Sequence, residues 1–261
     1  MNTIDIRGVT IGAGQPKIAI SLTGSSKNTV LAQADTLREW PVDIIEWRMD
    51  CFEAVEDPAA VCDCLATLRP LVGRTILLAT FRSAQEGGNH ALSTEDYIAL
   101  NEAVLASGAA DLLDVELFAP GKAAPRLIDA AHSVNCPVIL SSHDFQKTPP
   151  VQEMVSRLCR MQEMGGDILK LAVMPQSHKD VLALLQATEE MERCYAHQPL
   201  ITMSMGELGR CTRLCGGFFG SCVTFGAATQ SSAPGQIPAK KLRQILDLTF
   251  EHNGDMPFDF A

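Results

Sequence analysis

Apolar residues recur along the chain in short runs rich in Ile, Leu and Val, and longer amphipathic stretches separate these runs. Runs of seven to nine residues with this composition are typical of β-strands. The pattern predicts eight strands, at residues 18–24, 42–50, 75–82, 111–117, 137–145, 168–174, 199–205 and 222–228. No linker or low-complexity segment interrupts the series, so we expect one domain over residues 1–261.

The stretches between the runs have the periodicity of crossover helices. In residues 26–40, 93–108 and 149–166, a serine or proline precedes apolar residues that are three and four positions apart. Glycine ends the second and third of these segments, as is common at helix C-termini. We therefore predict a helix in each segment.

Eight strands that alternate with helices require a parallel sheet. We predict that this sheet closes into a (β/α)8 TIM barrel, because closure leaves no exposed sheet edge. An open doubly wound sheet is the alternative, but no G-x-G-x-x-G motif follows the first run and polar residues end nearly all eight runs. The N-terminal residues 5–20 begin with a predicted β-hairpin, which we expect to cover the bottom of the barrel.

The charge and the N-terminal sequence favour a soluble protein of the cytoplasm. A formal net charge of -10 and a pI near 5.0 argue against nucleic acid or an anionic membrane surface as a partner. The first residues lack the basic and apolar regions of a signal peptide, and no run approaches the roughly 18 apolar residues of a membrane span.

Cysteine usage also favours a reducing compartment, because nine cysteines cannot all pair within the chain. The closely spaced pairs are Cys62 with Cys64 and Cys211 with Cys215. Neither has a second pair or a histidine at the spacing of a zinc site. We predict that these side chains serve packing and that the protein holds no metal.

Among the residues of the predicted strands, Lys170 has the side chain that is most costly to bury. With a period of two, Ile168 and Ala172 lie on the same side of the strand as Lys170, which places an amine among apolar residues. Burial and nearby positive charge favour the neutral amine, and this form attacks a ketone or aldehyde to give an imine. For a lone strand lysine, the alternatives are an ion pair with a carboxylate or a side chain that extends to the rim of the barrel.

His143 ends the preceding predicted strand and shares a face with Ser141 and Ile139. Active sites of (β/α)8 barrels lie at the C-terminal ends of the strands, so we expect His143 beside Lys170. An imidazole can take a proton from the carbon next to an iminium and return a proton to a leaving hydroxyl. The pair therefore indicates an elimination, although a lone histidine is more often structural.

Three arginines, Arg48, Arg82 and Arg213, end or follow predicted strands. A guanidinium binds a carboxylate through two parallel hydrogen bonds, so we expect these three to converge on a small anionic substrate. Glu46 lies two residues before Arg48 on the same face, and it is a candidate salt-bridge partner of Arg48.

Acidic and small residues complete the predicted site. Asp114 and Glu116 end the fourth predicted strand, and we expect them to orient other groups. Glu86 precedes two glycines in the loop after the third strand, where it can tune the histidine. After the eighth strand, Ser232 and Gln236 lie in a segment of small residues whose composition suits either a lid or an ordinary turn.

The chain resembles the type I 3-dehydroquinate dehydratase family over nearly its whole length. The matching stretches, in the order of the family, are EWRMD, TFRSAQEGG with STEDYIAL, SSHDF, ILKLAVMPQS, MSMGELGR with Arg213, and SSAPGQI. The resemblance implies a (β/α)8 hydro-lyase of the shikimate pathway, a homodimer without metal or cofactor. It also implies the reaction, which is the conversion of 3-dehydroquinate to 3-dehydroshikimate by syn loss of water.

The resemblance further implies roles for individual residues. Lys170 matches the imine-forming lysine, His143 the general acid/base, and Glu86 the group that assists the histidine. Arg213 matches the residue that binds the substrate carboxylate. The residues that match groups bonding the substrate hydroxyls or closing the site are Glu46, Arg48, Arg82, Ser232 and Gln236, with Ser21 as a further candidate.

Two other hypotheses remain open at this point. A class I aldolase would share the barrel and the lysine, but such enzymes usually bind a phosphate at a glycine-rich site after the seventh and eighth strands. A non-catalytic binding barrel would keep the fold and leave the lysine unreactive. Turnover of 3-dehydroquinate distinguishes both from the dehydratase.

Overall fold

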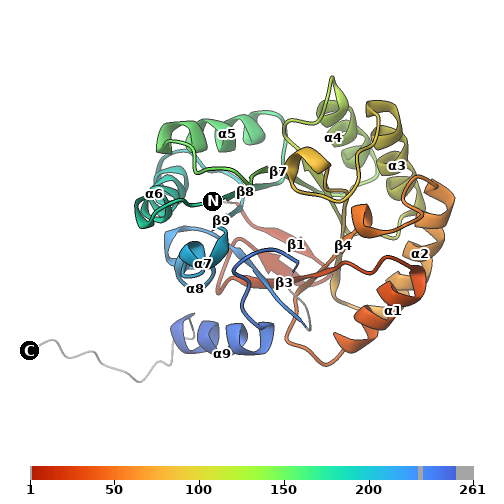
Figure 1. The fold of residues 1–261 in the computed structure, drawn as a ribbon, viewed down its shortest axis with the longest axis horizontal. Helices are drawn as coiled ribbons and strands as arrows, with labels where there is room; N and C mark the ends of the chain where they lie inside the picture. Colours follow the sequence, from red (N-terminus) through yellow and green to blue (C-terminus); the bar gives the residue numbers. More distant parts are fainter. Residues whose placement is uncertain (1, 229–231, 251–261) are drawn as a thin grey trace, which may run out of the picture.

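The structure is a computed structural model, and it describes residues 2–228 and 232–250. Eight parallel strands form one sheet, and helices surround it in a ring (Figure 1). Neighbours along the sheet follow the order β10-β3-β4-β5-β6-β7-β8-β9. The strands are β3 (Lys17–Leu22), β4 (Ile44–Arg48), β5 (Ile76–Thr80), β6 (Leu112–Glu116), β7 (Val138–Asp144), β8 (Ile168–Val173), β9 (Leu200–Ser204) and β10 (Val223–Gly226).

These strands confirm the eight predicted runs and the (β/α)8 barrel, with strand bounds that are shorter by a few residues. The barrel closes weakly between β9 and β10. There, a single bridge joins Leu200 and Ser221, and the amide of Cys222 donates to the Leu200 carbonyl at 2.8 Å. The Ser221 hydroxyl accepts from the amide of Thr202 at 3.0 Å, so a side chain replaces part of the backbone ladder.

The helices follow the strands of the barrel along the chain and pack on its outside (Figure 1). The α-helices are α1 (Lys27–Thr36), α2 (Pro58–Leu71), α3 (Thr94–Ser107), α4 (Ala123–Ser133), α5 (Val151–Glu163), α6 (His178–Cys194), α7 (Gly206–Gly209), α8 (Thr212–Cys215) and α9 (Ala239–Phe250). Short 3-10 turns are η1 (Met49–Cys51), η2 (Ala84–Glu86) and η3 (Gly216–Phe219). Helices α1, α3 and α5 confirm the three predicted segments. Within the described residues, no helix combines the length and the apolar character that crossing a bilayer requires.

Two hydrophobic layers form the core. The outer layer lies between sheet and helices, and the inner layer fills the barrel with alternate strand residues such as Ile139, Ile168 and Ala172. The inner position of Ile168 and Ala172 confirms the period-two assignment for β8 and places Lys170 on the barrel interior.

The N-terminal hairpin joins β1 (Ile4–Ile6) to the antiparallel β2 (Val9–Ile11), as predicted. Arg7 and Gly8 turn the chain with positive φ angles of 52° and 81°, which suits a two-residue hairpin loop. Ile6 and Ile11 pack into the inner layer together with Ile44 and Ile76, near the N-terminal ends of the strands. The hairpin therefore covers the bottom of the barrel, and the opposite end remains for a site.

Candidate active site

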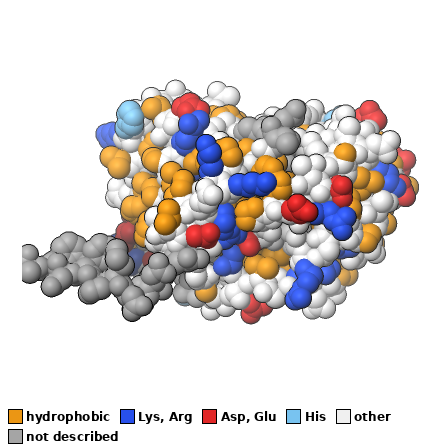
Figure 2. All heavy atoms as spheres, turned by 90° about the horizontal axis from the view of Figure 1, so that it is seen from below, with side chains coloured by type: hydrophobic (Ala, Val, Ile, Leu, Met, Phe, Trp, Pro, Cys, Tyr) orange, Lys and Arg blue, Asp and Glu red, His pale blue; other side chains and the backbone are white. Residues whose placement is uncertain are grey.

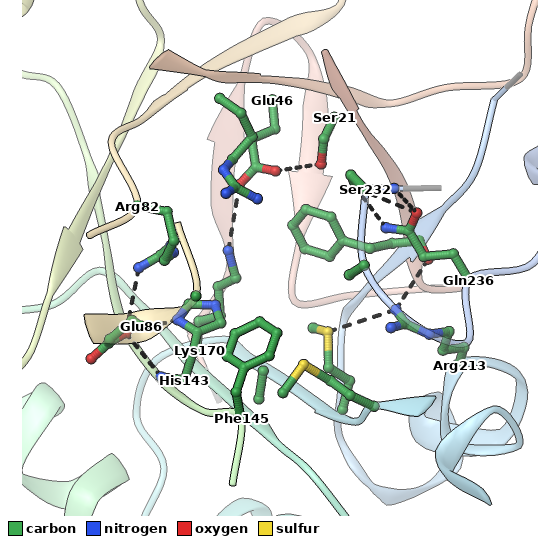
Figure 3. A pocket seen from close by; sticks show the side chains of 17 residues that line it. Ser21, Glu46, Arg82, Glu86, His143, Phe145, Lys170, Arg213, Ser232 and Gln236 are labelled. Carbon is green, nitrogen blue, oxygen red and sulfur yellow. Dashed lines mark hydrogen bonds and ion pairs between the residues drawn. The ribbon is translucent and has the colours of Figure 1, made fainter. Parts of the chain in front are cut away.

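A pocket of about 580 Å³ lies at the C-terminal end of the barrel. Figure 3 shows its lining side chains converging from several strand ends and the loops that follow them. The pocket is lined by all ten residues for which the family resemblance implies a role: Ser21, Glu46, Arg48, Arg82, Glu86, His143, Lys170, Arg213, Ser232 and Gln236. The other two predicted residues, Asp114 and Glu116, are buried behind this lining. The remaining lining residues are Gly87, Phe145, Ala172, Met203, Met205, Phe225 and Ala233.

Lys170 lies deep in the pocket with 4% of its surface exposed. Its Nζ is 3.0 Å from Asp114 Oδ2, 3.6 Å from Glu46 Oε1, and 4.7 Å from the centre of the Phe225 ring. The amine of Lys170 therefore faces the pocket, as an imine-forming group must. It also forms the ion pair with carboxylates that was one alternative prediction. A proton must leave Nζ before the amine attacks a ketone.

His143 and Glu86 form a close pair beside Lys170 (Figure 3). Oε2 of Glu86 accepts the backbone N–H of His143 at 2.9 Å and lies 2.9 Å from the ring Nδ1. Because Ser141 pairs with Lys170 and His143 with Ala172 across β7 and β8, the imidazole lies one step nearer the mouth than the amine.

The environment shifts the proton affinities of this pair in opposite directions. Burial raises the pKa of Glu86 to about 8, and the Glu116 and Asp114 carboxylates add to this effect against the opposing charge of Arg82. Burial also lowers the pKa of His143 well below its usual value, and the cations Arg82, Lys170 and Arg48 lower it further. When Glu86 is ionised, Nδ1–H donates to Oε2 and Nε2 is free to accept a proton.

Arg82 is buried and its guanidinium is held by carboxylates. Nη2 donates to Asp114 at 2.7 Å and Nη1 donates to Glu116 at 2.9 Å, while Glu86 Oε2 lies 3.5 Å from Nη1. Although burial opposes the charged form, these carboxylates hold the pKa of Arg82 above its ordinary value. The predicted orienting groups Asp114 and Glu116 therefore act on Arg82, and Asp114 also reaches Lys170.

The predicted pairing of Glu46 with Arg48 is wrong. Arg48 donates from Nε and Nη2 to the two oxygens of Asp50, at 2.7 and 2.8 Å. Glu46 instead accepts hydrogen bonds from the hydroxyls of Ser21 and Thr80. Asp50 also accepts the amides of Arg82 and Asn89, so it ties the end of β4 to the loop that carries Glu86.

Arg213 differs from the other two arginines because no carboxylate pairs with it in the part of the chain that the structure describes. It is 2% exposed, and its guanidinium donates to the backbone carbonyls of Phe225 and Pro234, at 3.2 and 3.1 Å. Its Nε has no partner there. Burial lowers the pKa of Arg213 to about 10. A buried cation without a counter-ion is a strong site for an anionic group.

The segment after β10 is described only in part, because residues 229–231 lie outside the described residues. The predicted lid begins there at Gln230. In the described portion, Ser232 and Gln236 bond each other, with Gln236 Nε2 donating to Ser232 Oγ at 2.9 Å. Both side chains face the pocket (Figure 3).

The apolar wall of the pocket was missed at the level of sequence. It consists mainly of Phe145, Met203, Met205 and Phe225. Met203 and Met205 follow Ile201 with the period of two that places them inside the barrel, so the alternation in residues 199–205 was the available signal.

Residues 2–228 and 232–250 contain no cluster of three His, Cys, Asp or Glu side chains that could hold a metal ion. Cys64, from one of the two close cysteine pairs, is buried in the outer hydrophobic layer. The absence of a metal and of a cofactor from the working enzyme stays a prediction.

Comparison with known proteins assigns the chain to a family. The family model for type I 3-dehydroquinase matches residues 18–253. A 3-dehydroquinate dehydratase of Clostridioides difficile (strain 630) is 48% identical over 245 residues, which cover 94% of this chain and 96% of the relative. A 3-dehydroquinate dehydratase of Salmonella agona (strain SL483) is 47% identical over 95% of this chain and 98% of its own length.

Solved structures agree with this assignment. The type I 3-dehydroquinate dehydratase of Clostridium difficile, solved with covalently modified comenic acid, superposes with a TM-score of 0.93 at 47% identity. That match covers 95% of this chain and 98% of the other. The chain therefore belongs to the type I 3-dehydroquinase family.

Proposed function

We propose that this chain is a hydro-lyase that dehydrates 3-dehydroquinate to 3-dehydroshikimate through an imine on Lys170. The observation that carries the proposal is the placement of Arg213, a buried cation without an acidic partner in the described chain, in the same pocket as the Lys170 amine. The substrate carries a carboxylate and a ring ketone, so one group matches each residue. The names of the family and of the relatives refer to the same reaction.

The reaction follows from the order of groups in the pocket. After Nζ of Lys170 loses a proton, it attacks the ketone carbon, and the carbinolamine loses water to give an iminium. His143 Nε2 then removes a proton from the adjacent carbon, and the electron pair moves toward the iminium nitrogen. The neighbouring hydroxyl leaves as water when His143 returns the proton. A water molecule then hydrolyses the product imine and releases the amine of Lys170.

The other lining residues bind and orient the ring. We assign the substrate carboxylate to Arg213, and the hydroxyls to Glu46, Arg48, Arg82, Ser232, Gln236 and Ser21. Arg82 has the least freedom of these, since its guanidinium already donates to Asp114, Glu116 and Ser141. Glu86 assists by holding the ring of His143 in one orientation.

A covalent step also fits the relative from Clostridium difficile, which was solved with covalently modified comenic acid. An aldolase reaction on a phosphorylated sugar fits the pocket less well. The described residues after β9 and β10 present Arg213, Ser232 and Gln236 rather than a glycine-rich phosphate site.

Trapping of the imine tests the proposal. Borohydride is added to the enzyme during turnover of 3-dehydroquinate, and peptide mass mapping locates the reduced adduct. We expect a single adduct on Lys170 and none in Lys170→Met. Turnover without any adduct on Lys170 would overturn the imine mechanism, and inert 3-dehydroquinate would overturn the substrate.

The variant His143→Ala separates imine formation from elimination. It retains the amine and Arg213, so the borohydride adduct on Lys170 should still form. Elimination should slow by about 100-fold or more, because a positioned acid/base contributes 10²–10⁴ in rate. Elimination at the wild-type rate in this variant would remove His143 from the mechanism.

We further propose a homodimer of single-domain subunits in the cytoplasm. All nine cysteines are free thiols, as expected in a reducing compartment. Phe218 and Leu248, which are 62% and 86% exposed, are apolar side chains available to a second copy. Figure 2 shows acidic and basic groups interspersed on one face, without the broad basic surface that nucleic acid would need. Light scattering that gives the monomer mass at micromolar concentration would contradict the dimer.

A further inference from the structure

We propose that Asp114 is the counter-ion of the iminium on Lys170 and thus a further catalytic residue. This inference rests on the proposed imine mechanism. Asp114 has no exposed surface and is not among the residues that line the pocket. Its Oδ2 lies 3.0 Å from Nζ of Lys170, the atom that becomes the iminium nitrogen.

The carboxylate of Asp114 is fixed so that one oxygen is reserved for Nζ. Oδ1 accepts Nη2 of Arg82 at 2.7 Å and the hydroxyl of Ser141 at 2.7 Å. Among the described residues, Oδ2 has a hydrogen bond only with Lys170. Arg82 and Lys170 hold the pKa of Asp114 at about 2 in spite of its burial, so the group is an anion throughout the working range.

The charge at the lysine nitrogen explains why a fixed anion is useful. An ammonium and a ketone combine to give an iminium and water, so one positive charge is present at nitrogen before and after the reaction. A carboxylate that pairs with the resting ammonium therefore pairs with the iminium without reorganisation. The anion keeps the imine protonated, and only the protonated imine accepts the electron pair released when the adjacent carbon loses its proton.

Other groups around Nζ do not replace Asp114. Glu46 Oε1 is 3.6 Å from Nζ, but it also accepts the Thr80 hydroxyl and lines the pocket, where substrate contacts it. The Phe225 ring faces Nζ from β10.

The other carboxyls of the site have different partners, since Glu86 contacts His143 and Glu116 contacts Arg82. Among the described carboxylates, only Asp114 and Glu46 lie within 4 Å of Nζ, and the iminium has a single N–H to donate. Asp114 Oδ2 is the anionic oxygen closest to it.

Two carboxylate variants distinguish a counter-ion from a structural support of Arg82. Asp114→Asn and Glu116→Gln each take one carboxylate from Arg82, but only Asp114 contacts Nζ. Each variant is incubated with the product 3-dehydroshikimate, whose ketone also forms the imine. Borohydride reduces both forms of the imine, whereas cyanoborohydride reduces the protonated form.

In Asp114→Asn we expect the borohydride adduct on Lys170 to persist, while reduction by cyanoborohydride slows on the order of 100-fold, as does kcat. The alkaline limb of the kcat profile should move to lower pH. Glu116→Gln should keep the wild-type ratio of the two reductions. If the ratio of cyanoborohydride to borohydride reduction were unchanged in Asp114→Asn, Asp114 would not be the counter-ion. An equal fall of this ratio in Glu116→Gln would also overturn the proposal.

A measurement on the wild type covers the case in which Asp114→Asn does not fold. With 15N at the lysine Nζ, the nitrogen chemical shift of the imine reports its protonation directly. We expect the imine to stay protonated up to the highest pH at which the protein is folded. Loss of the imine proton near neutral pH would refute the inference. If wild-type enzyme gives no adduct on Lys170, the imine mechanism itself fails, which is a distinct outcome.

Discussion

Oε2 of Glu86 lies 2.9 Å from the backbone nitrogen of His143 and 2.9 Å from Nδ1 of its ring. One carboxylate oxygen therefore fixes both the backbone and the imidazole of the same residue. Since the backbone N–H always donates, this oxygen is held as an acceptor. The ring is thereby oriented with Nε2 available for proton transfer.

The pH dependence of elimination should reveal this pair. The pKa of Glu86 is raised to about 8, so the carboxyl ionises as pH rises through about 8 and then strengthens His143 as a base. We predict a limb near pH 8 on which wild-type kcat increases with pH. In Glu86→Gln this limb should vanish and kcat should fall by about 10- to 100-fold. Superposable profiles for wild type and variant, measured from pH 6 to pH 9, would show that Glu86 does not tune His143.

Arg213 should govern substrate affinity. It faces the pocket without an acidic partner in the described chain, so its charge is available to the substrate carboxylate. We predict that Arg213→Met raises KM on the order of 100-fold with a smaller change in kcat, because removal of one partner of a buried charge pair costs about 2–5 kcal/mol. Steady-state kinetics with 3-dehydroquinate measure the split. If only kcat fell in Arg213→Met, the substrate carboxylate would bind to a residue other than Arg213.

Arg82 should contribute more than Arg213 to the stability of the folded protein. Its loss leaves the buried carboxylates of Asp114 and Glu116 without their counter-charge. We predict that Arg82→Met lowers the free energy of unfolding by about 3–5 kcal/mol. Arg213→Met is the matched control and should change it by about 1 kcal/mol or less, since no buried carboxylate loses its partner. Equal urea midpoints for the two variants would contradict this division of roles.

The positions of Lys170 and His143 were predictable because each depends on a local rule, whereas Arg213 lies in α8, beyond the end of β9. Alternation places Lys170 between Ile168 and Ala172 on the barrel interior, and strand ends in this fold open into one mouth. The proposed roles of these residues rest on the resemblance to the family as well as on their positions.

The ion pairs of the site were less predictable. The contact of Asp114 with both Arg82 and Lys170 joins three strand regions, and it depends on a register between neighbouring strands that alternation does not specify. Glu46 was assigned to Arg48 because the two share a face in an extended strand. The strand ends at Arg48, and the 3-10 turn that follows places Asp50 against the guanidinium instead.

The loop that carries Glu86 should tolerate little change at Gly87. Gly87 has a φ of 84°, which favours glycine, and a Cβ there would lie 2.4 Å from Cε2 of Phe145. We predict that Gly87→Ala displaces Glu86 from His143 and lowers kcat by about 10-fold or more, because a small misplacement of a catalytic group is costly. Gly73→Ala is the control, since Gly73 has a similar φ of 58° but no atom within 4 Å of its added Cβ.

The two glycine variants carry similar backbone strain, of order 1–3 kcal/mol, and the clash with Phe145 adds to it only in Gly87→Ala. Both variants should therefore lose thermal stability, but only Gly87→Ala should lose activity. Adding Phe145→Ala to Gly87→Ala removes the clash with the ring and should restore part of the lost kcat. The single variant Phe145→Ala corrects for the loss of an apolar wall of the pocket. If Gly73→Ala lost as much activity as Gly87→Ala, general destabilisation would explain the effect, and the contact between the loop and Phe145 would not position Glu86.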